Sequence, residues 1–168
     1  AYGRSKLAGE EGIRASGCDH LIFRTSWVYA ARGANFLRTI LRLAAEREEI
    51  RVVDDQIGSP TFTRDLAEAL VELAEGGYRG LCHFACAGQT SWHGFAERIL
   101  GRAGYRGRLV AIRSDQLQRP APRPAYSVLD TGRYSASSDV EALKAFDFAV
   151  ISVPTPMSEG APDLSYIE

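Results

Sequence analysis

The chain has 168 residues, of which 45% are hydrophobic and 24% are charged, and its formal net charge at pH 7 is −1. These values are typical of one ordinary globular domain that can bury a sizeable core. Because acidic residues are interspersed among the arginines, no basic tract indicates a nucleic-acid or anionic-membrane partner. No apolar run approaches the roughly 20 residues of a membrane span, and no signal peptide precedes the first predicted helix. The expected compartment is therefore the cytoplasm.

The three cysteines and three histidines form no metal-binding pattern. Cys18, Cys82 and Cys86 lack the paired spacing of a zinc site, so no structural metal is expected. Cys82 and Cys86 lie in an apolar run and are predicted to be buried thiols.

A tyrosine and a lysine four residues apart lie at the start of the chain. Apolar and small residues recur with helical spacing over residues 3–16, and Gly17 is a plausible end of that helix. Tyr2 and Lys6 would share one helical face, where an ammonium beside the phenol would lower the tyrosine pKa from its normal value of about 10. Tyr2 is therefore a candidate proton donor or acceptor near neutral pH. The alternative is a solvated surface pair, although only two of the 20 basic residues are lysines and one of them is placed here.

A short apolar run at residues 20–25 predicts a buried parallel strand. Trp27 follows at its carboxyl end, where open α/β sheets bind ligands. Its indole could form one wall of a sugar or nicotinamide site, or it could simply belong to the core. Asn35 is predicted to cap a helix over residues 36–48, whose positive amino end could face a phosphate.

The rest of the chain alternates strands and helices at short intervals. This order implies right-handed crossovers and a mainly parallel sheet. Strands are predicted over residues 50–53, 80–85 and 109–112, and helices over 63–75, with Thr63 as the cap, and from Thr90 or Ser91 to about 103.

Two irregular segments are candidates for ligand binding. The polar loop 54–61 has its course fixed by Gly and Pro, and it could carry function or be a plain turn. The proline-rich segment 119–127 is predicted to be extended on the surface. There Arg119 and Arg123 could pair with phosphate or remain solvated charges.

The usual cradle for a dinucleotide pyrophosphate is absent from the sequence. No Gly-x-Gly-x-x-Gly or Gly-x-x-Gly-x-x-Gly turn follows a predicted strand. The chain also begins inside a predicted helix without an initiator methionine, as a fragment would.

Jointly, the motifs of residues 1 to about 131 resemble those of the dTDP-4-dehydrorhamnose reductases, which are extended short-chain dehydrogenases/reductases. The resemblance implies an α/β fold with a partial Rossmann-like parallel sheet and flanking helices, the carboxyl-terminal, substrate-binding half of such an enzyme. The matching stretches occur in the family's order: Tyr-Gly-Arg-Ser-Lys-Leu-Ala-Gly-Glu at 2–10, Arg-Thr-Ser-Trp-Val-Tyr at 24–29, Asn-Phe at 35–36, Val-Val-Asp-Asp-Gln-Ile-Gly-Ser-Pro-Thr at 52–61, Thr-Ser-Trp at 90–92 and Arg-Pro-Ala-Tyr-Ser-Val-Leu-Asp at 123–130.

The resemblance also implies roles for individual residues. Tyr2 would protonate the hexulose oxygen while NADPH, or NADH, delivers hydride to its carbon. Lys6 would hold the nicotinamide ribose and lower the pKa of Tyr2. Trp27 would face both the sugar and the nicotinamide, so Tyr2, Lys6 and Trp27 are the expected cofactor contacts. The nucleotide-sugar side would be lined by Asn35, Phe36, Gln56, Pro60, Thr61 and Arg123.

Two departures from the family's pattern divide the chain into a reductase-like portion, 1–131, and a second segment, 132–168. The amino-terminal half of the pattern is missing, with the glycine-rich turn and the Ser or Thr of the catalytic set, so most of the cofactor site is expected to be missing too. From about residue 135 the chain instead resembles an internal stretch of the UDP-sugar 6-dehydrogenase family.

The resemblance of the second segment to the UDP-sugar 6-dehydrogenase family rests on two short motifs, Val-Pro-Thr-Pro at 153–156 and Pro-Asp-Leu-Ser at 162–165. A short helix over 139–146 and a buried strand over 148–153 are expected there. The chain is interpreted as a join of two partial nucleotide-sugar enzymes.

Three functions follow from these patterns as hypotheses. The first is NADPH-dependent reduction of dTDP-4-dehydro-6-deoxy-L-mannose to dTDP-L-rhamnose, by an incomplete enzyme. The others are a non-catalytic nucleotide-sugar-binding or regulatory module of the same fold, and a non-functional gene fragment. The expected partners are a dTDP-sugar and either a second copy in a homodimer or a complementing chain, with no nucleic acid and no membrane.

Overall fold

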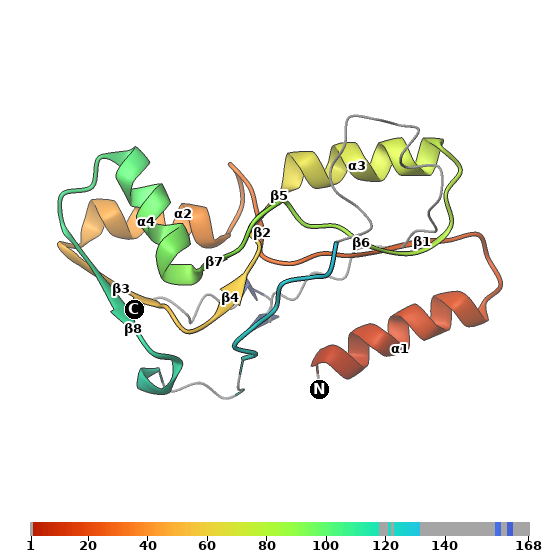
Figure 1. Cartoon of the computed structure of the whole chain (residues 1–168), viewed down its shortest axis with the longest axis horizontal. Coiled ribbons are helices and arrows are strands. Elements are labelled where there is room, and N and C mark those ends of the chain that lie inside the picture. The colour runs from red at the N-terminus through yellow and green to blue at the C-terminus, as the bar shows by residue number, and fades with distance from the viewer. Residues whose placement is uncertain (1, 118–120, 122, 132–156, 159–160, 163–168) are drawn as a thin grey trace.

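The computed structural model describes residues 2–117, 121, 123–131, 157–158 and 161–162 (Figure 1). Its helices are α1 (Tyr2–Ala15), α2 (Phe36–Glu46), α3 (Thr63–Glu75) and α4 (Trp92–Ala103), with a short 3-10 helix η1 (Ser114–Gln116). Its strands are β1 (Leu21–Arg24), β2 (Val28–Tyr29), β3 (Glu49–Val53), β4 (Ile57–Gly58), β5 (Thr61–Phe62), β6 (Gly80–His83), β7 (Thr90–Ser91), β8 (Arg108–Ile112), β9 (Met157–Ser158) and β10 (Ala161–Pro162).

The strands pair two by two, and most of the pairs are parallel. β1 pairs with β6, β2 with β5 and β3 with β8 in parallel register, whereas β4–β7 and β9–β10 are antiparallel. The predicted α/β fold with a partial parallel sheet and flanking helices is therefore confirmed. The helix expected over 139–146 and the strand expected over 148–153 lie outside the described residues. Among the described helices, none is long and apolar enough to cross a membrane.

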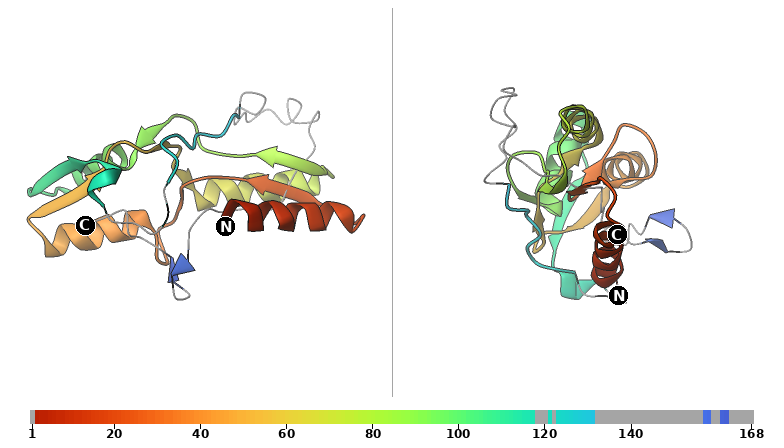
Figure 2. Two further views of the ribbon diagram at one scale, coloured as in Figure 1. Left: turned by 90° about the horizontal axis from the view of Figure 1, so that it is seen from below. Right: turned by 90° about the vertical axis from the view of Figure 1, so that its right-hand side faces the viewer.

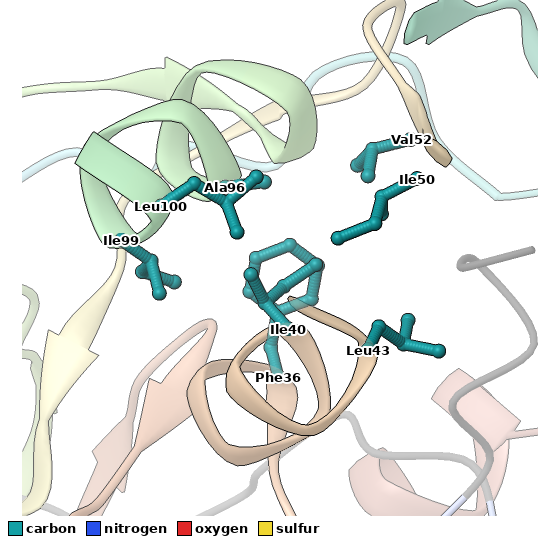
Figure 3. Packing of buried hydrophobic residues seen from close by; sticks show 8 residues of the cluster. All are labelled: Phe36, Ile40, Leu43, Ile50, Val52, Ala96, Ile99 and Leu100. Carbon is teal, nitrogen blue, oxygen red and sulfur yellow. The ribbon is translucent and has the colours of Figure 1, made fainter. Parts of the chain in front are cut away.

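The molecule is elongated, with a separate core towards each end (Figures 1 and 2). At one end, α2 and α4 pack against β3 and β8; at the other, α1 and α3 accompany β1 and β6. The first core is drawn in Figure 3 and consists of Phe36, Ile40, Leu43, Ile50, Val52, Ala96, Ile99 and Leu100. The second core consists of Phe23, Leu66, Leu73 and Cys82.

The two helices of the first core begin at the polar caps that the sequence predicts. The Asn35 side chain accepts a hydrogen bond from the backbone N–H of Arg38 at 3.2 Å, and the Ser91 side chain accepts one from Gly94 at 2.9 Å. Such caps satisfy amide donors that have no partner inside the helix. The helix ends then fix where the chain enters and leaves the core.

The predicted cap of α3 is wrong. Thr63 is the first residue of the helix, and the cap position is taken by Phe62, which makes no side-chain capping bond. The reason is that Thr61 and Phe62 pair with β2 as strand β5 and lead directly into the helix. Tertiary pairing has overridden the local capping preference here.

The two cysteines expected to be buried differ in their surroundings. Cys82 is 3% exposed, and burial raises the pKa of its thiol to about 12. Cys86 is half-buried, and its Sγ donates to an Asp65 carboxylate oxygen at 3.4 Å. A thiol with a raised pKa is a poor nucleophile, so Cys82 serves packing.

Candidate functional site

Tyr2 and Lys6 lie together in the first turns of α1, on one exposed face. The Lys6 Nζ is 5.5 Å from the centroid of the Tyr2 ring, within the range of a cation–π contact. Tyr2 is 37% exposed and Lys6 is also exposed. The phenol and the ammonium are therefore accessible to a ligand that approaches the amino end of α1.

An ion pair joins α1 to β1. Arg24 donates from Nε to Oε1 of Glu10 at 2.9 Å and from Nη2 to Oε2 at 2.8 Å. Glu10 is the one buried residue of α1. The hydrogen bond from Arg24 holds the pKa of Glu10 below its usual value, and the same bond raises the pKa of Arg24. Such a bidentate pair fixes geometry as well as adding stability.

The Glu10–Arg24 pair also determines what lies beside the amino end of α1. The helix and β1 run in opposite directions (Figures 1 and 2). The carboxyl end of β1, which Trp27 follows, therefore lies on the same side of the ion pair as the amino end of α1, where Tyr2 and Lys6 lie.

We expect the Glu10–Arg24 pair to make stability depend on pH. Because the folded-state pKa of Glu10 is depressed, the unfolded chain, with a glutamate pKa of about 4.3, takes up the proton first as pH falls. The contribution of the pair is thus full above about pH 5 and is lost as pH falls through the folded pKa. In urea unfolding, Glu10→Gln should lower the free energy of unfolding by about 1 kcal/mol at pH 7, since Arg24 is partly solvated, and by progressively less as pH falls below about 4.

The matched control is Glu46→Gln, because Glu46 makes an exposed pair with Arg42 four residues earlier in α2. Exposed pairs of this spacing contribute about 0.5 kcal/mol or less. Equal pH dependence in the two variants would contradict the role assigned to Glu10.

Trp27 sits at the carboxyl end of β1 in an unusual backbone conformation. Its φ is 48°, in the left-handed region, which costs a bulky residue on the order of 1–2 kcal/mol. Its ring stacks on Trp92 with centroids 3.6 Å apart and planes 6° apart. Its Nε1 donates to Ser127 Oγ at 3.2 Å, and its carbonyl accepts from Thr61 N–H at 3.1 Å. The surrounding contacts thus hold the indole in one place.

The other predicted ligand-lining residues use their side chains within the chain. The Asn35 amide donates to the carbonyls of Ala30, Arg32 and Gly33 while its oxygen caps α2. Phe36 is 3% exposed and packs against Trp92 and Phe95. Their contact with a ligand stays a prediction, and any such contact by Phe36 would need a change in the core.

The loop that carries Gln56, Pro60 and Thr61 is folded inward at two of these positions. Gln56 is buried and donates from Nε2 to Ser114 Oγ at 2.7 Å. Thr61 is fully buried, and its hydroxyl donates to the Ser59 carbonyl at 3.2 Å. Pro60 is half-buried, as is Arg123 in the extended segment 123–131. The structure brings Trp27 close to Thr61 through the backbone and to Phe36 through Trp92, whereas Gln56 points to η1.

Sequence reasoning assigned no role to Glu10, Arg24, Gly58, Trp92 or Ser127. All five occur inside the motif stretches, so the residues were visible but their contacts were not. An Arg at the end of a strand and a Glu inside the preceding helix were the available signal for an ion pair. The contacts of Gly58 and Ser127 had no local signal, because they join segments far apart in sequence.

A second polar network holds the loop after β3 against η1. The Asp55 carboxylate accepts from both the backbone N–H and the hydroxyl of Ser114, at 2.6–3.1 Å. Although partial burial opposes it, the hydrogen bonds from Ser114 lower the pKa of Asp55. Ser114 therefore links Asp55 and Gln56 and fixes the start of the polar loop.

A groove of about 550 Å³ between α2 and α4 is lined by Tyr29, Leu37, Leu41, Phe95, Arg98, Ile99, Arg102 and Ala103, and it contains none of the predicted site residues. Among the residues that the structure describes, no group of three or more His, Cys, Asp or Glu side chains is arranged to hold a metal ion.

Parallel strand pairs, flanking helices and a Tyr–Lys pair at the start of a helix define a protein of the extended short-chain dehydrogenase/reductase class. The chain belongs to the family of the RmlD substrate binding domain, whose model matches residues 1–150. This match runs past residue 131, where the sequence suggested a boundary; the division into 1–131 and 132–168 stays a prediction.

Several relatives are named dTDP-4-dehydrorhamnose reductase. The protein of Burkholderia thailandensis is 48% identical over 148 residues, covering 77% of this chain and 49% of the relative. That of Mycolicibacterium smegmatis is 40% identical over 166 residues, covering 95% of this chain and 50% of the relative. The crystal structure of the Bacillus anthracis reductase in complex with NADP has a TM-score of 0.73 and 35% identity, covering 89% of this chain and 50% of that one. The chain thus spans about half the length of the curated relatives it matches.

Proposed function

We propose that this chain is the substrate-binding half of an NADPH-dependent dTDP-4-dehydrorhamnose reductase, which reduces dTDP-4-dehydro-6-deoxy-L-mannose to dTDP-L-rhamnose. The observation that carries the proposal is the exposed Tyr2–Lys6 pair at the start of α1, the helix that the Glu10–Arg24 ion pair joins to β1. The names of the relatives, together with their identity to this chain, support the same reaction.

In this reaction Tyr2 donates its hydroxyl proton to the sugar oxygen as the carbonyl carbon is reduced. Lys6, beside the ring, provides a positive charge that favours the phenolate left behind. Trp27 supplies a flat apolar wall against which a sugar ring can be oriented. Proton transfer from a positioned side chain accelerates such a step by about 10²–10⁴-fold.

The residues present fit one end of the cofactor. Tyr2 and Lys6 are exposed and could hold the nicotinamide ribose by hydrogen bonds, and NADPH would supply the hydride. Within the part of the chain that the structure describes, no Gly-x-Gly-x-x-Gly or Gly-x-x-Gly-x-x-Gly turn follows a strand, so these residues provide no conventional cradle for the pyrophosphate. We therefore expect this chain alone to bind NADPH weakly.

The partners follow from the same proposal. The small-molecule partner is a dTDP-sugar, and the protein partner is a second copy or a chain that completes the cofactor site. The expected compartment is the cytoplasm.

The second candidate function is a non-catalytic nucleotide-sugar-binding module. The Tyr2–Lys6 pair favours the enzyme over this module, since a pure binding module has no need of a proton donor. The two candidates share one property, which is recognition of a nucleotide diphosphate sugar.

We expect the unmutated chain to bind dTDP-rhamnose at up to millimolar concentration, with shifts in its amide NMR spectrum. Arg123→Ala should raise the Kd by about tenfold, because hydrogen bonds between a guanidinium and phosphate contribute about 1.5–3 kcal/mol. The titrations are made at one ionic strength, since salt screens such contacts.

The matched control is Arg102→Ala, an exposed arginine of α4, which should leave the Kd unchanged. No spectral change with the unmutated chain at millimolar ligand would mean that it has no working nucleotide-sugar site. Equal effects of the two arginine substitutions would remove Arg123 from the proposed site.

A further inference from the structure

Three extended segments lie side by side beneath Trp27. β4 pairs antiparallel with β7, with Ile57 opposite Ser91 and Gly58 opposite Thr90. On the other side of β4, the backbone carbonyl of Ile57 accepts a hydrogen bond from the N–H of Ser127 at 2.9 Å. The backbone N–H of Ile57 donates a hydrogen bond to the carbonyl of Ala125 at 2.8 Å. The segments around residues 57, 91 and 126 are far apart in sequence, so their meeting is a product of the fold (Figure 1).

Each of these segments contributes one contact to the Trp27 indole. Trp92, which directly follows β7, stacks on it at 3.6 Å. Gly58 approaches the ring so closely that a Cβ at this position would overlap it. The Ser127 hydroxyl donates its single proton to the Ile57 carbonyl at 3.1 Å, and its oxygen accepts from the indole N–H at 3.2 Å.

We propose that Gly58, Trp92 and Ser127 are positioning residues, which hold the Trp27 indole in the one orientation that a bound sugar meets. The proposal rests on the proposed function. Rotation of the indole would break the stack with Trp92 and the hydrogen bond to Ser127 together, and the lack of a Cβ at Gly58 leaves room for the ring where it lies. Because the indole is already held in place before the ligand arrives, its side chain loses no further conformational entropy on binding.

The stack can be measured without any ligand, because Trp27 and Trp92 are the only two tryptophans of the chain. Two indoles stacked face to face are expected to give an exciton couplet in the far-ultraviolet circular dichroism spectrum. Gly58→Ala keeps both indoles but should displace Trp27, so the couplet should disappear. Gly101→Ala is the matched control, because a Cβ at Gly101 in α4 meets nothing within 4 Å.

The binding of dTDP-rhamnose is then measured by NMR titration on the same proteins. Gly58→Ala should raise the Kd at least tenfold, about 1.4 kcal/mol, whereas Gly101→Ala should change it less than twofold. Trp92→Leu should behave like Gly58→Ala. Trp92→Phe should restore most of the affinity, because an aromatic ring can still stack on Trp27.

The outcomes separate this proposal from the proposed function. If Gly58→Ala loses the couplet but binds dTDP-rhamnose as tightly as the unmutated chain, the positioning role is overturned and the function stands. If the unmutated chain shows the couplet but binds no dTDP-rhamnose, the proposed function fails and the positioning role fails with it. Should Gly58→Ala not fold, Ser127→Ala and the Trp92→Leu and Trp92→Phe pair provide the same comparison, and equal affinity in all three overturns the proposal.

Discussion

Replacing Tyr2 by phenylalanine is expected to lower reductase activity by about 100-fold or more, the scale of a lost general acid. The assay uses this chain joined to the portion of the Burkholderia thailandensis relative that it does not cover. The substitution keeps the ring beside Lys6 and removes only the hydroxyl, so the Kd for dTDP-rhamnose should change little. A fall in kcat with an unchanged Kd would identify the hydroxyl as the proton donor.

The control for this experiment is Tyr105→Phe, which removes a hydroxyl that donates to the Arg47 carbonyl at 3.0 Å, beside the end of α2. Its activity should stay within about twofold of the unmutated protein, since surface hydrogen bonds contribute only about 1 kcal/mol to stability. Lys6→Arg should also lower activity, because a planar guanidinium does not reproduce the geometry of an ammonium. Full activity of Tyr2→Phe would show that the proton comes from another group.

Replacing Phe36 by alanine is expected to destabilise the chain by about 3–5 kcal/mol, the range for a large aromatic side chain lost from a core. Phe36 is 3% exposed and lies 4.6 Å from the Trp92 ring and 5.3 Å from the Phe95 ring, centroid to centroid. Such a loss is a large fraction of the total stability of a domain. Urea unfolding followed by circular dichroism measures it directly.

Leu41→Ala on the same helix is the matched control, because Leu41 is 36% exposed. It should cost about 1 kcal/mol or less. The comparison also tests the role that the family resemblance gave to Phe36 as a ligand contact. If Phe36→Ala kept its stability within about 1 kcal/mol but lost affinity for dTDP-rhamnose, Phe36 would be a ligand contact rather than a core residue.

Features with a local cause could be predicted from the sequence. Asn35 begins α2 because a short polar side chain before an apolar helical run satisfies the first amides, and the short apolar runs became the parallel strands β1, β3, β6 and β8. The same reasoning failed at Thr63, where β5, paired with β2, leads directly into the helix, so that the helix starts one residue earlier than it would with Thr63 as its cap.

The contacts that build the candidate site could not be predicted in this way. The Glu10–Arg24 pair and the Trp27–Trp92 stack join residues from different elements, and only the assembled fold brings them together. The left-handed backbone of Trp27 is the clearest case. A tryptophan rarely adopts it, so neither residue type nor pattern indicates it.

The separation of the two cores has a consequence for how the chain responds to a ligand. No described residue belongs to both clusters, and the chain passes between them through the two-residue ladders β2–β5 and β4–β7. Short ladders with few buried apolar contacts open locally at a lower free energy than core strands and helices do. Trp27 lies at this junction, and its stack on Trp92 and its hydrogen bond to Ser127 are among the contacts that keep the junction closed. A sugar bound there would protect the junction from opening more than it would protect either core.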